Sequence, residues 1–306
     1  MTPERIFVKI AAYRDPELLK TVSSLLAAAE HPRRIDFGIV NQVGDETRGQ
    51  LDSLRADARF TIYEFDWTQS LGLGWARNMC DQMWQGQAFS LQIDSHMRFR
   101  RGWDTQFITD WRRTADDMAV LSCYPAIYGF NADGSEFYEH TLPHQIEIQT
   151  TPDDGIPRLH AGPDTAPLTP GVFVAGGLQF NQGTACRDVP NLPEVFYGDE
   201  TAHSVRLFTH GYNVYAPSDV TAYHLYERHK WMNVHYWHQD MMQDPALARR
   251  YRNRHRLNMD TMRELLTDES SVFAGTHRGQ AKFWNSLPNR PQQAVSNSIE
   301  APSAGL

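Results

Sequence analysis

The chain has 306 residues, 41% of them hydrophobic, which is enough to bury the core of one large α/β domain or two modest ones. Its 37 acidic residues outnumber its 29 basic ones, and the net charge of −8 argues against the basic surface of a nucleic-acid binder. No run of about 18 apolar residues predicts a membrane span, and no signal-peptide pattern follows Met1. The three cysteines are widely spaced and odd in number, which argues against a disulfide framework and predicts a cytoplasmic protein.

Strand-like and helix-like segments alternate over roughly the first 125 residues. Buried-strand patterns occur at 6–12, 35–40, 60–65, 89–93 and 119–122. Helical spacing of apolar residues occurs at 16–29, 71–83 and 103–116. Asp15 is the expected N-cap of the first helix, with Pro16 at its first position. The alternation predicts an α/β fold in which helices flank a mostly parallel sheet.

The second part of the chain has a different pattern. Residues 131–170 carry many Pro, Gly and Asp residues and little periodicity, so we expect a long functional loop there. Strand patterns return at 171–180, 214–216 and 220–226. Helices are expected from Asp199 to a left-handed cap at Gly211 and, as a polar helix, over 245–266. We expect one domain over 1–287 and, because apolar residues are sparse, a disordered tail over 288–306.

The strand at 89–93 ends on side chains that bind metal ions. Asp94 and His96 lie two residues apart beyond its carboxyl end, which is where ligands bind in open α/β sheets. Both side chains can turn toward one ion; Mg²⁺ prefers oxygen ligands, whereas Mn²⁺ and Zn²⁺ also accept nitrogen. The alternative for so short a motif is a turn with a solvated histidine. Four further histidines occur over 224–238 without a zinc spacing, so we expect at most one of them to be a ligand.

Several motifs occur in an order that resembles a known family. They are 13–16 (YRDP), 74–77 (GWAR), 91–99 (LQIDSHMRF), 103–104 (WD), 175–177 (AGG), 197–200 (YGDE), 206–212 (RLFTHGY) and 215–217 (YAP). Over roughly residues 5–230, this ordered set resembles the cytoplasmic polypeptide N-acetylglucosaminyltransferases that modify hydroxyproline or threonine. The resemblance implies a GT-A fold, with a nucleotide-sugar half over about 1–125 and an acceptor half over about 126–287. It also implies a retaining transfer of GlcNAc from UDP-GlcNAc to a hydroxyl of a peptide or protein.

In this resemblance the segment from Asp94 to His96 occupies the position of a D-x-D metal motif. Asp94 would hold the ion and touch the ribose or sugar, His96 would be a direct ligand, and His224 would be a third ligand from the C-terminal side. A histidine in place of the last carboxylate removes a negative charge and favours Mn²⁺, with Mg²⁺ as the alternative. For His224 the alternative is a half-buried histidine of a strand.

The resemblance places the nucleotide-sugar site after the first strand, on the following helix, at the metal motif and at a glycine pair: Tyr13, Arg14, Asp15, Arg77, Asp94, Ser95, Gly176 and Gly177. A salt bridge along its own helix is the alternative for Arg77. A β-bulge is the alternative for the glycine pair, which otherwise lets backbone approach a ligand. Asp104 either caps or contacts the sugar.

The resemblance places Asp199 and Glu200 beside the acceptor hydroxyl and the sugar, as the catalytic residues. Both fall at a helix N-terminus, where the helix dipole alone stabilises a carboxylate. In a front-face transfer they would orient the acceptor or stabilise the cationic sugar. In a covalent route one of them would be the nucleophile.

Other functions are compatible with parts of this pattern. The first is a nucleotide-sugar transferase with another donor sugar or a small-molecule acceptor, because one fold hosts many substrates. The second is a nucleotidyltransferase, against which the segment Ala11–Arg14 lacks a glycine-rich phosphate loop. The third is a non-catalytic module that binds a nucleotide sugar or glycan. Release of UDP that depends on a metal would separate the enzyme from this module.

Overall fold

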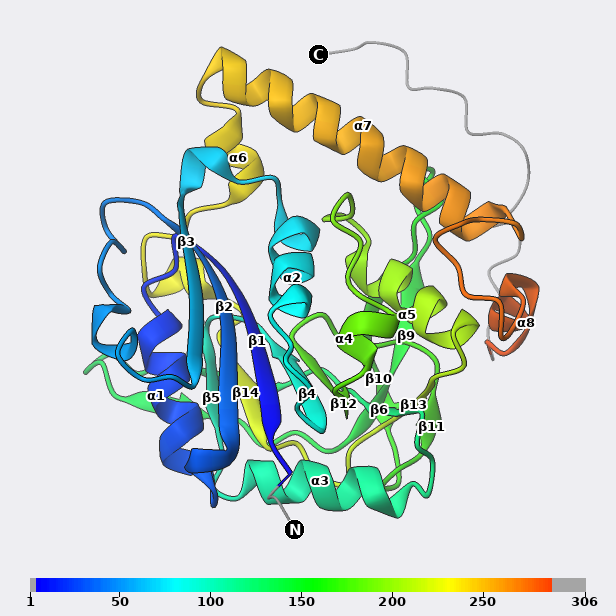
Figure 1. Ribbon diagram of the computed structural model, residues 1–306, viewed down its shortest axis with the longest axis horizontal. Coiled ribbons are helices and arrows are strands. Elements are labelled where there is room, and N and C mark those ends of the chain that lie inside the picture. The colour runs from blue at the N-terminus through cyan, green and yellow to red at the C-terminus, as the bar shows by residue number, and fades with distance from the viewer. Residues whose placement is uncertain (1–3, 288–306) are drawn as a thin grey trace.

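The computed structural model describes residues 4–287 and is built on one eight-stranded sheet (Figure 1). The strand order is β11 (Pro170–Gly171), β13 (Asn213–Tyr215), β6 (Ala119–Leu121), β12 (Leu178–Gln182), β4 (Phe89–Ile93), β1 (Ile6–Tyr13), β2 (Ile35–Val43) and β3 (Phe60–Asp66). Parallel pairs join β4 to β1, β1 to β2 and β2 to β3, which confirms the prediction of a mostly parallel sheet over this half. The predicted tail at 288–306 lies outside the described residues.

The strands of the first half form because both faces of the sheet are covered. Phe7 and Val8 of β1 point to opposite faces of the sheet and are both buried, as the nearly continuous apolar run predicts for a central parallel strand. The connections are the helices α1 (Leu18–Ala28), α2 (Leu73–Gln82) and α3 (Trp103–Arg113), which confirms the predicted alternation. Since β1 and β4 are parallel neighbours, the residues that follow them meet at one edge of the sheet.

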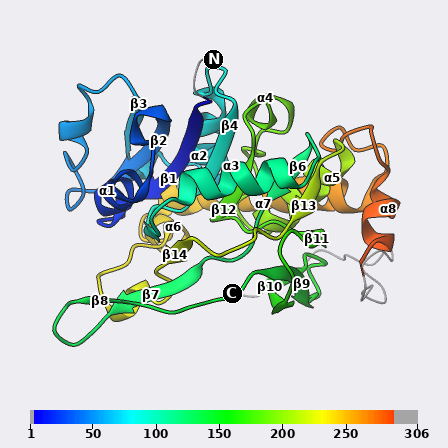
Figure 2. The same ribbon diagram turned by 90° about the horizontal axis from the view of Figure 1, so that it is seen from below.

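A second sheet brings the C-terminal part of the chain to that edge. Its order is β5 (Met97–Phe99), β14 (Ala222–His224), β7 (Ala126–Phe130) and β8 (Glu136–Tyr138). β14 pairs antiparallel with β5, and His224 lies opposite Met97. Figure 2 shows β14, β7 and β8 on the same side of the large sheet as the hairpin of β9 (His144–Thr150) and β10 (Arg158–Asp164). The register of β5 and β14 therefore places His224 next to the metal motif.

Two sequence predictions for the middle of the chain are wrong. Residues 131–170 are not one long loop, because they contain β8, β9 and β10. The residues at 145–148 alternate between polar and apolar. Ile146 and Ile148 pack into a hydrophobic cluster that includes Phe173 and Leu265, while Gln145 and Glu147 are only partly buried. The predicted strand at 171–180 is interrupted, since 172–177 lie outside the strands and β12 begins at Leu178.

The C-terminal helices are α4 (Ala185–Asp188), α5 (Asp199–Thr209), α6 (Trp237–Met241), α7 (Pro245–Thr267) and α8 (Gln280–Asn285). In Figure 1, α6 and α7 lie on the side of the molecule toward which β1 and β2 run, whereas α4, α5 and α8 lie on the side of β6 and β13. Gly211 follows α5 with a φ of 99°, which confirms the predicted left-handed cap.

The first helix begins later than predicted, because α1 starts at Leu18 with Glu17 as its N-cap. Asp15 accepts a hydrogen bond from the Glu17 backbone N–H, but its second carboxylate oxygen is used elsewhere. All three cysteines are free and buried. Over residues 4–287, no helix has the length together with the apolar character that a membrane crossing requires.

Candidate active site

Three side chains with metal-binding atoms converge beyond the end of β4. Asp94 follows β4, His96 precedes β5, and His224 is the last residue of β14. One ligand atom from each of the three lies within 4.8 Å of the others. The two imidazole rings are 4.5 Å apart between centroids, and His224 Nε2 lies 3.3 Å from Asp94 Oδ2. The structure thus brings together three residues that the sequence predicts as ligands.

The charges of this cluster fit a divalent cation. Although burial opposes ionisation, the hydrogen bond from His224 and the charge of Arg77 hold the pKa of Asp94 well below its usual value. Burial and the nearby His96 lower the pKa of His224 to about 4, so its imidazole is neutral at neutral pH. His224 Nδ1 is buried and has no hydrogen-bond partner among the described residues. One carboxylate and two imidazoles are a donor set that Mn²⁺ or Zn²⁺ accepts more readily than Mg²⁺ does.

Arg77 links the metal cluster to the predicted catalytic pair. Its side chain is buried, and its two terminal nitrogens bind Asp94 Oδ1 at 3.0 Å and Asp199 Oδ2 at 2.5 Å. These partners lie 17 and 122 residues away in the sequence, so the alternative of a salt bridge along one helix is wrong. Arg77 therefore joins β4 to the start of α5 through two ion pairs.

Glu200 lies beside Asp199 in the first turn of α5. Its Oε1 accepts a hydrogen bond of 2.6 Å from the Gly176 N–H, and its Oε2 accepts one of 2.8 Å from the Tyr124 hydroxyl. Burial and the negative charge of Asp199 raise the pKa of Glu200 to about 7. A carboxyl group with this pKa can change its charge near neutral pH, which is typical of functional sites.

The glycine pair lies against these charged groups. A Cβ atom on Gly177 would lie 2.5 Å from Asp94 Oδ2, and one on Gly176 would lie 3.2 Å from both terminal nitrogens of Arg77. Only glycine lets the chain pass so close to the cluster without displacing it. The contact of this glycine pair with a nucleotide sugar stays a prediction.

Tyr13 ends β1 and Arg14 follows it, and both contact the C-terminal helix α6. The Tyr13 hydroxyl and an Arg14 nitrogen donate to Asp240 of α6 at 3.0 and 2.9 Å. Arg14 also binds Glu46 at 2.7 Å and lies over the Trp67 ring at 5.0 Å. Their role in holding the nucleotide stays a prediction. Their contacts with Asp240 bring α6 next to the end of β1.

Two further residues have partners that the sequence does not reveal. Ser95 donates from its hydroxyl to Asp15 at 2.8 Å, so these two predicted nucleotide-sugar residues bind each other. Asp104 is fully buried and accepts from the backbone N–H groups of Glu30 and His31 at 2.9 and 3.0 Å. Of the two predictions for Asp104, the sugar contact is wrong, because its carboxylate holds the turn that follows α1.

Sequence reasoning missed Tyr124 and Asp240. Tyr124 had a usable signal, because it follows the strand predicted at 119–122 and so lies where strands end. Asp240 had none, since it lies in a short helix far from β1 in the sequence and meets Arg14 only through tertiary folding.

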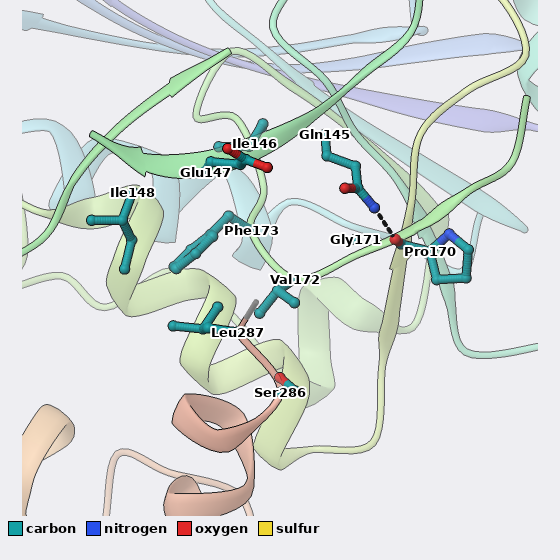
Figure 3. A pocket seen from close by; sticks show the side chains of 10 residues that line it. All are labelled: Gln145, Ile146, Glu147, Ile148, Pro170, Gly171, Val172, Phe173, Ser286 and Leu287. Atoms are coloured by element: carbon teal, nitrogen blue, oxygen red, sulfur yellow. Dashed lines mark hydrogen bonds between the residues drawn. The ribbon is translucent and has the colours of Figure 1, made fainter. Parts of the chain in front are cut away.

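A separate cavity of about 150 Å³ lies between β9, β11 and the end of α8 (Figure 3). Ile146, Phe173 and Leu287 supply much of its apolar wall, and Glu147 is its one charged lining residue. It includes none of the predicted site residues, so it does not mark the place of the chemistry.

The chain folds as a GT-A glycosyltransferase. Its structure is similar to that of GalNAc-T7, which was determined with UDP, GalNAc and Mn²⁺, with a TM-score of 0.57 at 14% sequence identity over 74% of this chain. This chain covers 44% of that longer one. S. aureus TarS 1-349 in complex with UDP-GlcNAc is 11% identical, with a TM-score of 0.49 over 85% of this chain and 72% of that chain. The mannosyltransferase PcManGT from Pyrobaculum calidifontis, with GDP-Man and Mn²⁺, is 12% identical, with a TM-score of 0.49 over 88% and 71%.

The sequence itself identifies the family. The model of the family described as Glycosyltransferase (GlcNAc) matches residues 5–58 and 43–286, so the chain belongs to this family of glycosyltransferases. No curated protein sequence matches it.

Proposed function

We propose that the protein is a metal-dependent retaining glycosyltransferase that moves GlcNAc from UDP-GlcNAc to a hydroxyl of a peptide or protein. The observation that carries the proposal is the convergence of Asp94, His96 and His224 beside the carboxylates of Asp199 and Glu200, within a chain of the GlcNAc glycosyltransferase family. A nucleotide-sugar donor needs both groups, because negative charge develops on the leaving diphosphate while positive charge develops on the sugar.

The metal cluster would hold Mn²⁺ through Asp94, His96 and His224. The ion supplies Lewis-acid stabilisation of the negative charge on the departing diphosphate. The donor set of one oxygen and two nitrogens supports Mn²⁺ over Mg²⁺. Arg77 contributes a fixed positive charge next to Asp94 and keeps that carboxylate ionised.

The transfer proceeds on one face of the sugar in this proposal. The bond from the sugar C1 to the acceptor oxygen forms as the bond from C1 to the phosphate oxygen breaks, and the acceptor proton passes to the departing phosphate. Asp199, held by Arg77, and Glu200, held by Gly176 and Tyr124, would stabilise the cationic sugar and orient the acceptor. Preorganised carboxylates lower the barrier because they need no rearrangement during the reaction.

The acceptor and the cell compartment rest on the resemblance to the polypeptide N-acetylglucosaminyltransferases. Hydroxyproline, threonine and serine hydroxyls are the acceptors that this resemblance implies, and a cytoplasmic location agrees with three free, buried cysteines.

The test is a UDP-release assay on the full chain over a panel of nucleotide sugars, with Mn²⁺ or with a chelator. The control is the double variant Asp94→Ala with His96→Ala, in which we expect release to fall by about a thousandfold or more because several kcal/mol of metal stabilisation are lost. Peptides that gain the mass of the sugar would then identify the acceptor.

Each outcome has a distinct meaning. Metal-dependent release from UDP-GlcNAc, lost in the double variant, supports the proposal. Release from another sugar alone keeps the reaction and removes GlcNAc as the donor. No release from any sugar, with nucleotide binding that a chelator does not change, points to a binding module instead.

A further inference from the structure

Asp15 lies between His96, a candidate metal ligand, and Arg228, which follows β14. It follows β1, its residue is 1% exposed, and three side chains donate to its Oδ2 atom. The distances are 2.7 Å from His96 Nδ1, 2.8 Å from Ser95 Oγ and 3.1 Å from an Arg228 nitrogen. Its Oδ1 accepts the Glu17 backbone N–H at 2.9 Å.

These contacts leave Asp15 no surface with which to bind a nucleotide. Both carboxylate oxygens already have donors, and the side chain is almost fully enclosed. A ribose hydroxyl would have to displace a buried partner, which costs the hydrogen bond and leaves a polar group unsatisfied. The residue therefore acts through its protein neighbours.

The main neighbour is His96, one of the candidate metal ligands. Arg228 can only donate, so the Asp15 oxygen that it contacts is an acceptor, and the proton shared with the imidazole belongs on His96 Nδ1. This tautomer leaves the lone pair of His96 Nε2 free for a cation. Histidine ligands of metals commonly donate their other N–H to a carboxylate, which fixes the ring and raises its basicity.

We propose that Asp15 is a positioning residue that holds His96 as a metal ligand through Nε2, rather than a residue that contacts the nucleotide sugar. The inference rests on the proposed metal-dependent function. It also explains the Arg228 contact, because one carboxylate then connects His96 to the segment that follows His224, the ligand on β14.

The first experiment measures the tautomer of His96 without any metal. Long-range ¹H–¹⁵N spectra of the histidine rings are recorded on the metal-free full chain, and His96→Gln identifies the His96 signals. We expect the wild type to carry the proton on Nδ1. A proton on Nε2 in the wild type overturns the proposal, and this measurement needs no variant of Asp15 and no catalytic activity.

The second experiment measures Mn²⁺ affinity by electron paramagnetic resonance, in the absence of donor and acceptor. Asp15→Asn keeps the shape of the side chain but offers both an acceptor and a donor, so it no longer selects one tautomer. We expect it to weaken Mn²⁺ binding by about tenfold to a hundredfold, while Asp15→Glu recovers part of the loss. The matched control is Asp110→Asn. Asp110 lies on α3, is also fully buried, and accepts a hydrogen bond from the Ser218 backbone N–H.

The outcomes separate three roles for Asp15. Weaker Mn²⁺ binding with unchanged metal-free UDP binding supports the proposal. Unchanged Mn²⁺ binding with weaker UDP binding overturns it in favour of a nucleotide contact. Equal loss of melting temperature in Asp15→Asn and Asp110→Asn, with Mn²⁺ binding unchanged in both, reduces Asp15 to a structural residue and also overturns it. If the wild type binds no Mn²⁺, the proposed metal dependence fails, while the tautomer measurement still decides the role of Asp15.

Discussion

At the end of β4, the charged partners of the Asp94 carboxylate outweigh the effect of burial, whereas at the start of α5 burial and the neighbouring Asp199 outweigh the groups that favour the charge of Glu200. Both are buried. His224 and Arg77 overcome the effect of burial on Asp94 and hold its pKa well below the usual value. For Glu200, burial and the neighbouring Asp199 together raise the pKa to about 7.

The pKa values of Asp94 and Glu200 differ partly because Arg77 forms an ion pair with Asp94 and none with Glu200. The guanidinium binds Asp94 and Asp199, and Glu200 receives only the Gly176 N–H and the Tyr124 hydroxyl. One carboxylate is thereby kept as a permanent anion, which suits a metal ligand. The other stays sensitive to protons near neutral pH, and such a divergence of two pKa values is typical of acidic groups with separate roles in one site.

Replacement of Arg77, which pairs with both Asp94 and Asp199, should have the largest effect on stability. We expect Arg77→Met to lower the free energy of unfolding by about 3–5 kcal/mol, because Asp94 and Asp199 lose a buried partner. Urea unfolding of the metal-free chain measures the loss. The control Arg263→Met removes an exposed partner of Asp260 on α7 and should cost less than about 1 kcal/mol. Equal losses in the two variants would show that the Arg77 ion pairs are not essential to stability.

The role of Glu200 in the reaction is the next test. Glu200→Gln preserves the shape and the two hydrogen-bond partners but removes the charge, so we expect the turnover number for UDP release to fall by about a hundredfold at pH 8. Glu264→Gln, a change on α7 next to Ser271, should leave turnover unchanged. Turnover near that of the wild type in Glu200→Gln would remove Glu200 from the catalytic pair.

The same variant should be more stable than the wild type at high pH. The pKa of Glu200 is about 7 in the folded state against a usual 4.5, so the folded state holds the proton more tightly, and wild-type stability falls as pH rises from about 4.5 to about 7. We expect metal-free Glu200→Gln to exceed the wild type by about 2 kcal/mol at pH 8, with the gain shrinking toward pH 5. Urea unfolding at several pH values measures this, and a gain that does not change with pH would contradict the raised pKa.

The smallest expected effect concerns the hydroxyl of Tyr124. Its hydrogen bond favours the ionised form of Glu200, so Tyr124→Phe should raise the pKa of Glu200 further. We expect the acid limb of the pH–turnover profile to move upward by roughly half to one unit. Tyr128→Phe removes a buried hydroxyl that contacts Glu17 and should not move it. A downward shift in Tyr124→Phe would mean that the acid limb belongs to another group.

Much of the nucleotide-sugar half could be predicted because its signals are local. The apolar runs at 6–12 and 89–93 and the helical spacing between them specify buried strands and covering helices, and β1, β4 and α1 form there. Asp94 and His96 could be predicted as site residues because they come just after the apolar run at 89–93. In the middle of the chain, β8 and the hairpin of β9 and β10 are partly exposed strands that depend on cross-strand pairing, and composition alone suggested a loop.

The sequence by itself determined the fold class, the order of the motifs and the residue types available for binding a metal and a nucleotide sugar. Only the tertiary structure decided their partners. Asp15 contacts His96, which is 81 residues away, and Arg77 binds Asp199, which is 122 residues away. The physical reason is that periodicity and caps act over a few residues, whereas the charge state of a buried carboxylate depends on the groups that distant strands and helices bring against it.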